Sequence, residues 1–266
     1  MNKTVVITGA SSGIGAALAI EYAKKKWQIV LAARSVEKLN EIAKECENLG
    51  AKILVTSCDV SKKTDCENLI NQTIEKFKHI DVLINNAGIS MRALFNDCKT
   101  DVLEQLMAVN FWGAVYCTKY ALPYLLKTKG SVVGVSSIAG IKGLPARTGY
   151  SASKFALHGF LESLRIENLK TGLHVLIACP GYTASNIRNS ALNSNGNAQS
   201  ESPLNEQKLM SAEKVATNII AAIEKRKSYT YMSLEGKMLY YLNKFFPLLM
   251  DKIVYNKVSK ETNSPF

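Results

Sequence analysis

The chain has 266 residues, of which 47% are hydrophobic and 21% are charged. This usage is typical of a globular protein and argues against a disordered or fibrous one, and the length suits a single α/β domain. The formal net charge of +11 favours anionic partners, such as a phosphorylated cofactor, an acyl carrier, an anionic membrane surface or nucleic acid. Because the basic residues are spread thinly and no nucleic-acid-binding motif is present, nucleic acid is disfavoured.

The six cysteines form no Cys-x-x-Cys pair, so the sequence indicates neither a zinc site nor a disulfide framework. This usage fits a reducing, cytoplasmic compartment. A strand-like run begins almost at Met1, so we expect no signal segment. No apolar run reaches about 18 residues, so we expect no membrane-spanning helix.

The first predicted strand, Thr4–Thr8, is followed by a glycine-rich turn and then by a helical pattern. The glycines allow positive φ and close approach of a pyrophosphate, and the helix N-terminus supplies free N–H groups. In this position the turn favours dinucleotide binding over a purely structural role. The predicted contacts are Gly9, Ser11, Ser12, Gly13, Ile14 and Gly15.

The second predicted strand, Gln28–Ala33, ends at Arg34. A side chain about 20 residues after the glycines is expected to read the cofactor ribose. Arginine can form bidentate bonds to a 2′-phosphate, whereas an acid would accept from a free 2′-hydroxyl. The sequence therefore favours NADP(H) over NAD(H), with a solvent-facing Arg34 as the alternative.

Two further predicted strands end in residues that suit a cofactor. After Lys52–Ser57 come Asp59 and Val60, where the carboxylate could accept from an adenine amino group or cap the next helix. After residues 81–84 comes Asn85-Asn86-Ala87-Gly88, whose small and amide side chains suit a loop lying against a cofactor. We predict contacts from Asp59, Val60, Asn86, Ala87 and Gly88.

Residues 100–127 predict two helical segments with Gly113 as their joint, and Asn110 lies near it. A lone helical asparagine is usually a capping or solvent-facing residue. A fifth strand over residues 132–135, a helix and a sixth strand, His174–Cys179, follow. This alternation predicts one domain with a parallel sheet covered on both faces.

The segment from Ser137 to Lys154 is the candidate reaction centre. If a helix begins near Gly149, Tyr150 and Lys154 are four residues apart and share one helix face. A free phenol titrates near ~10, so we expect the ammonium to favour the phenolate. Ser137 follows a strand at the ligand edge of the sheet and can donate to a carbonyl oxygen. Alone, Tyr-x-x-x-Lys is a common surface pair, but the other motifs favour a catalytic role.

These motifs agree in order and spacing with the short-chain dehydrogenase/reductase family, which the sequence resembles over roughly residues 3–184. The resemblance implies a Rossmann-type α/β fold: a doubly wound parallel sheet of seven strands in a three-layer αβα sandwich. Residues 228–233 would form the last strand, after a helix over residues 212–226. The motifs are Thr8-Gly9-x-x-x-Gly13-Ile14-Gly15, Asn85-Asn86-Ala87-Gly88, Ser137 with Tyr150-x-x-x-Lys154, and Pro180-Gly181.

The resemblance also implies a role for each motif residue. Tyr150 would be the general acid/base, and Lys154 would lower its pKa and hold the nicotinamide ribose. Ser137 would steady the substrate oxygen, and Asn110 would order a water in a proton relay. Arg34 resembles the NADP-preferring members. The cofactor contacts implied elsewhere are Asp59, Asn86, Pro180, Gly181 and Thr183.

We therefore expect an NADP(H)-dependent enzyme that moves hydride between nicotinamide and a carbonyl or secondary alcohol substrate. One alternative is a 3-oxoacyl-carrier-protein reductase, which the basic charge suits but the long tail does not support. Another is a non-catalytic NADP(H)-binding sensor, against which the intact catalytic residues argue. The family further implies a homodimer or homotetramer.

Two segments lie outside the common pattern. Residues 182–210 are rich in Asn and Ser and are expected to form a mobile substrate lid or a plain surface loop. Residues 235–260 form an amphipathic helical stripe broken at Pro247. The stripe is similar to tails by which some hydroxysteroid-type members rest on membranes, which would give peripheral membrane contact. Packing on the body or on a sister subunit is the favoured interpretation.

Overall fold

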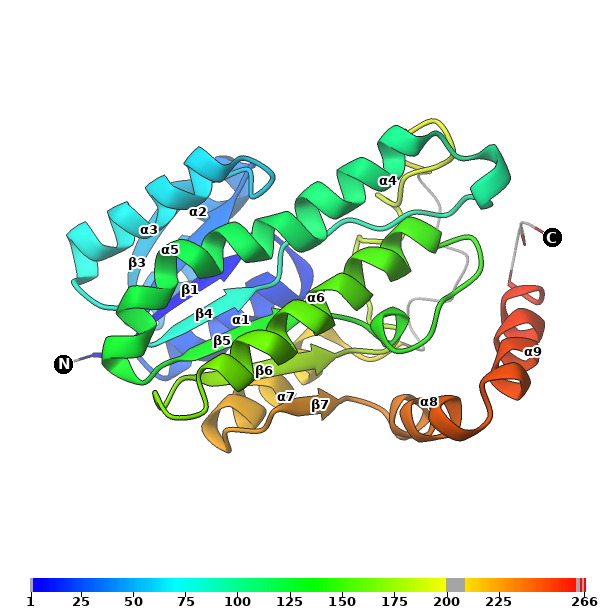
Figure 1. Cartoon of the computed structure of the whole chain (residues 1–266). Coiled ribbons are helices and arrows are strands. Elements are labelled where there is room, and N and C mark those ends of the chain that lie inside the picture. The colour runs from blue at the N-terminus through cyan, green and yellow to red at the C-terminus, as the bar shows by residue number, and fades with distance from the viewer. Residues whose placement is uncertain (1, 200–208, 262–263, 265) are drawn as a thin grey trace.

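The computed structural model describes residues 2–199, 209–261, 264 and 266. These residues form one parallel sheet of seven strands with helices on both faces (Figure 1). In space the strands follow the order β3-β2-β1-β4-β5-β6-β7, so the chain winds outward from β1 in both directions. The doubly wound, three-layer arrangement predicted from the sequence is confirmed.

The five inner strands are buried almost throughout, as a parallel sheet covered on both faces requires, whereas the edge strands β3 and β7 are partly exposed. Each described pairing of neighbouring strands is parallel. The seventh strand is shorter than predicted. The strands are β1 (Thr4–Thr8), β2 (Gln28–Ala33), β3 (Lys52–Ser57), β4 (Val82–Asn85), β5 (Ser131–Val135), β6 (His174–Cys179) and β7 (Tyr229–Tyr231).

The sheet separates two hydrophobic cores. Helices α1, α2 and α7 bury apolar side chains on one face, and α3, α5 and α6 do so on the other. Their sequences explain this, because each carries apolar residues at helical spacing. The helices are α1 (Gly13–Lys24), α2 (Val36–Asn48), α3 (Lys63–Phe77), α4 (Thr100–Met107), α5 (Gly113–Thr128), α6 (Thr148–Glu167), α7 (Ala212–Glu224), α8 (Leu234–Phe245) and α9 (Pro247–Val258).

Helices α4 and α5 are joined by a π-helical turn, Ala108–Trp112, so the predicted joint near Gly113 is present. Such turns are rare and are frequent at functional sites. Gly113 begins α5 and lies directly against the loop before α3. A β-carbon at this position would lie 2.8 Å from the β-carbon of Val60.

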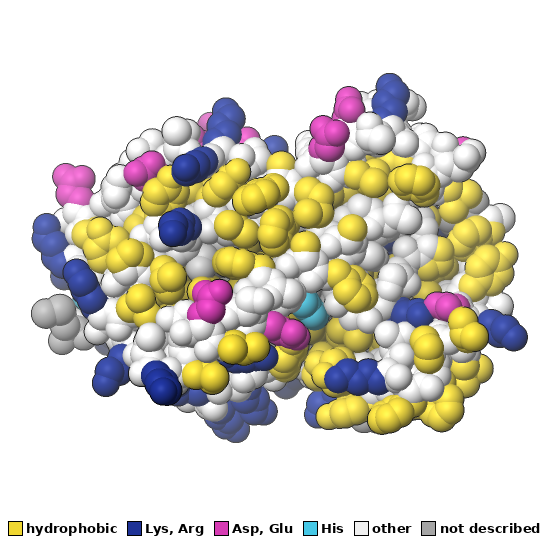
Figure 2. All heavy atoms as spheres, in the orientation of Figure 1, with side chains coloured by type: hydrophobic (Ala, Val, Ile, Leu, Met, Phe, Trp, Pro, Cys, Tyr) yellow, Lys and Arg dark blue, Asp and Glu magenta, His cyan; other side chains and the backbone are white. Residues whose placement is uncertain are grey.

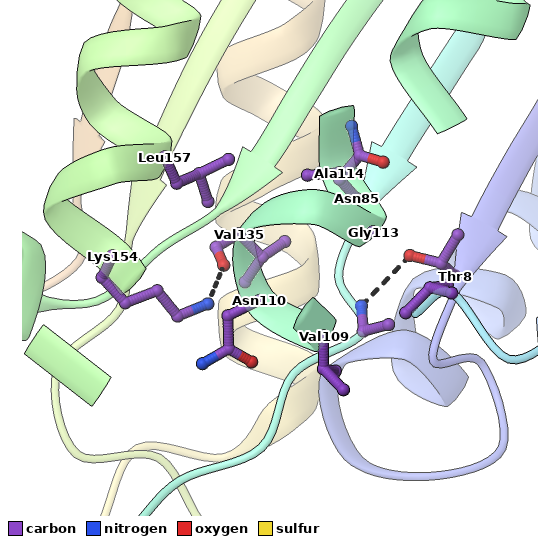
Figure 3. Close-up of a pocket in the computed structure, with 11 residues that line it drawn as sticks. Thr8, Asn85, Val109, Asn110, Gly113, Ala114, Val135, Lys154 and Leu157 are labelled. Carbon is purple, nitrogen blue, oxygen red and sulfur yellow. Dashed lines mark hydrogen bonds between the residues drawn. The ribbon is translucent and has the colours of Figure 1, made fainter. Parts of the chain in front are cut away.

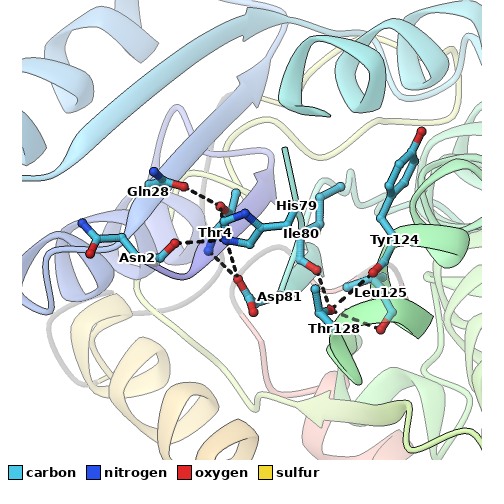
Figure 4. Close-up of polar contacts among 9 residues, drawn as sticks. All are labelled: Asn2, Thr4, Gln28, His79, Ile80, Asp81, Tyr124, Leu125 and Thr128. Atoms are coloured by element: carbon cyan, nitrogen blue, oxygen red, sulfur yellow. Dashed lines mark hydrogen bonds and ion pairs between the residues drawn. The ribbon is translucent and has the colours of Figure 1, made fainter. Parts of the chain in front are cut away.

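Polar groups connect the amino ends of three neighbouring strands (Figure 4). The Asp81 carboxylate accepts from the backbone N–H of Thr4 at 2.7 Å, and the Thr4 hydroxyl donates to Gln28 at 2.8 Å. The His79 ring lies 3.0 Å from the carbonyl oxygen of Asn2 and 3.3 Å from Asp81. These contacts fix where β1, β2 and β4 begin, and therefore where their carboxyl ends lie.

The segment after β6 crosses the carboxyl edge of the sheet. The Arg92 N–H donates to the Leu192 carbonyl at 2.8 Å, and the Leu192 N–H donates to the Ser90 carbonyl at 2.9 Å. Leu192 is also buried in a small apolar cluster with Met91 and Tyr150. Within residues 182–199 of the expected lid, Leu192 therefore ties the segment to the loop after β4. Residues 200–208 of that prediction lie outside the described residues.

The C-terminal extension forms α8 and α9, which break at Pro247 as predicted. One side of α9 packs on the body, because Met250 and Val258 are buried and Lys142 pairs with Asp251 at 2.5 Å. The other side exposes apolar side chains mixed with lysines (Figure 2). Within residues 2–199 and 209–261, no helix is long and apolar enough to cross a bilayer.

The contact between Gly113 and Val60 predicts that Gly113→Ala lowers the free energy of unfolding by about 1–3 kcal/mol, because the added methyl overpacks the core. Gly159→Ala on α6 is the matched control, since nothing lies within 4 Å of its added carbon. The control should be neutral or stabilising by up to about 1 kcal/mol, because alanine favours helix. Urea unfolding followed by circular dichroism measures both variants, and equal effects would contradict the packing argument.

Candidate active site

A cleft with a cavity of about 580 Å³ opens at the carboxyl edge of the sheet. It lies where β1 and β4 send the chain to opposite sides, which is where open α/β sheets bind ligands. All of the site residues predicted from the sequence line this cleft except Gly15 and Asn110. The structure therefore brings together residues from the first glycine turn to Thr183.

The glycine turn fits a pyrophosphate on its own geometry. Gly9 and Gly13 have φ of +65° and +55°, in the left-handed region that favours glycine. Gly15 lies behind the turn, where a β-carbon would overlap the Gly9 carbonyl. The first turn of α1 has no side-chain cap at Ser12, so its N–H groups are open to an anion.

Asn86 lines the cleft, but its side chain also supports this turn. Its amide donates to the carbonyl oxygens of Thr8 and Gly9 at 2.9 and 3.1 Å. The Thr8 hydroxyl in turn accepts from the backbone N–H groups of Asn86 and Ala87 at 3.0 and 3.1 Å. The motif after β4 therefore fixes the shape of the turn after β1.

Arg34 and Asp59 lie together at the end of the cleft formed by the loops after β2 and β3. Burial raises the pKa of Asp59, but this effect is outweighed by the hydrogen bonds from Ser61 and the charges of Arg34 and Lys62. The net shift of the pKa is downward, so the carboxyl is ionised. Its Oδ1 accepts from the Ser61 N–H and hydroxyl at 3.1 and 2.7 Å. The carboxylate therefore shapes the turn before α3.

Ser137, Tyr150 and Lys154 meet where β5 and α6 face each other. The Lys154 ammonium is buried and donates to the Val135 carbonyl at 2.9 Å (Figure 3). It lies 5.7 Å from the centre of the Tyr150 ring. The Ser137 side chain lies close enough to the Tyr150 phenol to lower its pKa, so two hydroxyls and an ammonium are gathered in one part of the cleft.

The pKa of the Tyr150 phenol differs from the value expected from the sequence. Burial raises it, whereas the hydrogen bond with Ser137 and the charges of Arg147 and Arg188 lower it, and the net shift is upward. Burial outweighs the groups that lower this pKa, because the side chain is only 9% exposed, and the lowering by Lys154 expected from the sequence stays a prediction. Burial likewise lowers the pKa of Lys154, to about 8.

Asn110 lies in the π-helical turn and is buried, so the general expectation of a capping or solvent-facing asparagine does not hold. Its Oδ1 accepts from the Ile89 N–H at 2.8 Å, and its Nδ2 donates to the Ile89 carbonyl and the Ser153 hydroxyl, both at 2.9 Å. It shares a small pocket with Lys154 (Figure 3). A β-carbon at Gly88 would lie 3.2 Å from Asn110 Oδ1 and 3.6 Å from Lys154 Nζ.

Sequence reasoning missed two arginines in the cleft, Arg147 and Arg188. Both are buried, and both lower the pKa of Tyr150. Arg147 could have been found from its position three residues before Tyr150, inside the reactive segment. Arg188 gave no such signal, because it lies in the segment of least recognisable pattern.

The chain matches the family model for short chain dehydrogenases over residues 3–196. An 11-beta-hydroxysteroid dehydrogenase-like 4A from Arabidopsis thaliana is 37% identical over 251 residues, which are 93% of this chain and 82% of the relative. An 11-beta-hydroxysteroid dehydrogenase from Pinus massoniana is 41% identical over 187 residues, or 70% of this chain and 52% of the relative. The chain therefore spans about half the length of the pine relative.

Two solved structures are similar in fold. A short chain dehydrogenase/reductase from Burkholderia phymatum in complex with NAD gives a TM-score of 0.82 at 24% identity, covering 94% of this chain and 95% of its own. An alcohol dehydrogenase from Thermococcus sibiricus complexed with 5-hydroxy-NADP gives 0.73 at 24% identity, covering 84% and 91%. With the matched residues and the Arabidopsis relative, these findings lead to one conclusion: the chain belongs to the short-chain dehydrogenase family.

Proposed function

We propose that this protein is an NADP(H)-dependent oxidoreductase acting on a carbonyl or secondary alcohol substrate. The observation that carries the proposal is the meeting of the Ser137 and Tyr150 hydroxyls with the Lys154 ammonium on the wall of a cleft whose glycine turn fits a pyrophosphate. The names of the similar structures, one with NAD and one with an NADP derivative, support a nicotinamide cofactor.

The residues divide the chemistry in a simple way. A bound nicotinamide supplies or accepts the hydride. Tyr150 gives the proton to the substrate oxygen in reduction, and Ser137, beside the same phenol, donates to that oxygen as negative charge develops. Lys154 uses one of its three donors on Val135, which leaves two for the cofactor ribose or the phenol.

Tyr150→Phe is expected to reduce kcat for carbonyl reduction by about 10²- to 10⁴-fold, because the proton donor is lost while the ring is retained. NADPH binding, followed by its fluorescence, should be unchanged. Tyr116→Phe on α5, outside the cleft, is the matched control. The measurement is NADPH oxidation with a panel of ketones. A wild-type protein that binds NADPH but reduces none of them would favour the sensor alternative.

The preference for NADP(H) over NAD(H) rests on charge at the end of β2. Arg34 and Lys38 both line the cleft, and Arg34 is exposed, so its guanidinium can meet a 2′-phosphate with two parallel bonds. Asp59, the ionised carboxylate nearby, is already bonded to Ser61. The cation is therefore the group best placed to read the ribose.

Arg34→Asp should lower kcat/KM for NADPH by about 10- to 100-fold and improve the value for NADH relative to it, because a charge-assisted bond is replaced by repulsion. Lys44→Asp on α2 makes the same change of charge away from the cleft and should leave the ratio unaltered. Steady-state kinetics with both cofactors decides the point. An unchanged ratio in Arg34→Asp would show that this residue does not select the cofactor.

We also propose that the outer face of α8 and α9 rests on an anionic membrane surface. Apolar side chains project from both helices, and Phe245 and Leu248 are 74% and 77% exposed. The same two helices carry the exposed Lys244 and Lys252. Figure 2 shows hydrophobic and basic side chains together at this end of the molecule. Such a face can bury rings and aliphatic chains at the headgroup level while its cations meet anionic lipid. The opposite face of α9 packs on the body, which holds the exposed face of the helix toward the outside of the folded protein.

The double substitution Phe245→Ser with Leu248→Ser should reduce flotation with vesicles containing anionic phosphatidylserine, because buried apolar area is lost. Leu169→Ser, with a residue 74% exposed just beyond α6, is the control. Light scattering, which measures the molar mass, tests the competing explanation that this face contacts a sister subunit. If the double variant lowers the molar mass and the wild type does not float, the face contacts a sister subunit instead.

A further inference from the structure

We propose that the cleft takes a carbonyl substrate that carries a carboxylate, held by the guanidinium of Arg147. The inference rests on the proposed function and adds the chemical class of its substrate. Arg147 lies immediately before α6 and lines the cleft three residues ahead of Tyr150. A group bound to it is therefore attached close to the reacting carbonyl.

The surroundings of Arg147 are unusual for an arginine. The residue is only 9% exposed, and charged side chains are seldom so buried unless they are paired. Among the described residues its guanidinium has one ion pair, with Glu261, and the 3.8 Å separation exceeds a hydrogen bond. The planar guanidinium carries five N–H donors whose geometry matches a carboxylate. It is thus desolvated at the cleft wall with its donors available to a ligand.

A second guanidinium adds to the positive potential at this end of the cleft. Arg188 is 5% exposed, lines the same cleft and donates to the Thr183 carbonyl at 2.6 Å. The charges of Arg147 and Arg188 both lower the pKa of the Tyr150 phenol and that of Tyr182, so they act at the reacting group itself. An anion between them gains from both charges.

The carboxylate already present is shared between two arginines. Glu261, just beyond α9, lies 3.5 Å from Arg92 and 3.8 Å from Arg147. Burial lowers the pKa of Arg92, Glu261 raises it and Arg147 lowers it, so the two guanidiniums are close enough to repel each other. A substrate carboxylate would relieve this repulsion by supplying a second negative charge.

The same end of the cleft has apolar walls, which suit a carbon skeleton rather than a bare small acid. Ile89, Leu144 and Leu192 line it beside the arginines. A neutral, wholly apolar skeleton such as a steroid would bury the N–H donors of Arg147 that Glu261 does not reach and would give them no acceptor, at a cost in binding free energy. The relatives' names make a neutral steroid the competing substrate class.

The test compares oxo acids with their methyl esters. 2-Oxobutanoate, 3-oxobutanoate, 4-oxopentanoate and 5-oxohexanoate vary the distance between carbonyl and carboxylate, and each ester removes only the charge. With NADPH, we expect kcat/KM for at least one acid to exceed that of its ester by about 10- to 100-fold, as charge-assisted bonds allow.

Substitutions of the arginines and of Glu261 test whether Arg147 causes this preference for the acid over its ester. Arg147→Met should abolish this preference, measured as the ratio of the two kcat/KM values, so that an effect of the lost charge on Tyr150, common to acid and ester, cancels. Arg147→Lys keeps the charge but lacks the planar pair of N–H donors and should retain part of the preference. Arg92→Met is the matched control, because Arg92 shares Glu261 but does not line the cleft. Glu261→Gln should preserve or raise the preference, since a competing carboxylate is removed. If Glu261→Gln instead lowers it as Arg147→Met does, Arg147 only anchors the tail and the inference is overturned.

The outcomes separate this inference from the proposed function. Esters, or a neutral steroid ketone, reduced as efficiently as every acid would overturn the carboxylate site and leave the reductase intact. If no carbonyl is reduced, calorimetry with the NADPH-loaded Tyr150→Phe variant decides. Binding of an oxo acid but not its ester supports the anion site, and equal or absent binding overturns it.

Discussion

A hydrogen bond joins the reactive helix to the end of β5, from the buried ammonium of Lys154 to the carbonyl of Val135. Val135 is the last residue of β5, and Ser137 lies two residues further on, so the bond sets the serine hydroxyl near the helix that carries Tyr150. The three groups therefore cannot be positioned independently. An ammonium removed from water needs such a partner, and burial accordingly lowers its pKa to about 8, which leaves it mainly protonated at neutral pH.

Much of the fold could be predicted because its signals are local. A β-branched run such as Thr4–Thr8, a glycine-rich turn and an amphipathic helix can each be recognised from a few neighbouring residues. The alternation of such strands and helices implies a parallel sheet. Six of the seven predicted strands agree with the structure within one residue at each end, and the break at Pro247 is found where expected. The gathering of Ser137, Tyr150 and Lys154 followed from helix spacing and strand order alone.

The remaining features depend on contacts between distant segments, which periodicity does not record. The burial of Tyr150, which raises the pKa of its phenol, comes from side chains such as Leu192 and Met91, far along the chain in both directions. Arg188 enters the site only when the segment after β6 folds over the loop after β4. Asn110 looked like an ordinary helical asparagine because nothing in its sequence neighbourhood shows the π-helical turn.

That turn has a geometric consequence for the whole helical layer. A π-type turn holds one residue more than an α-type turn, and each α-helical residue advances by about 100°. The helix before it can thus face α6 while the helix after it faces α3, although the chain never leaves the helical path. The extra residue rotates the packing face of α5 relative to that of α4. In the wider turn between them, the buried side-chain amide of Asn110 bonds to the backbone of Ile89.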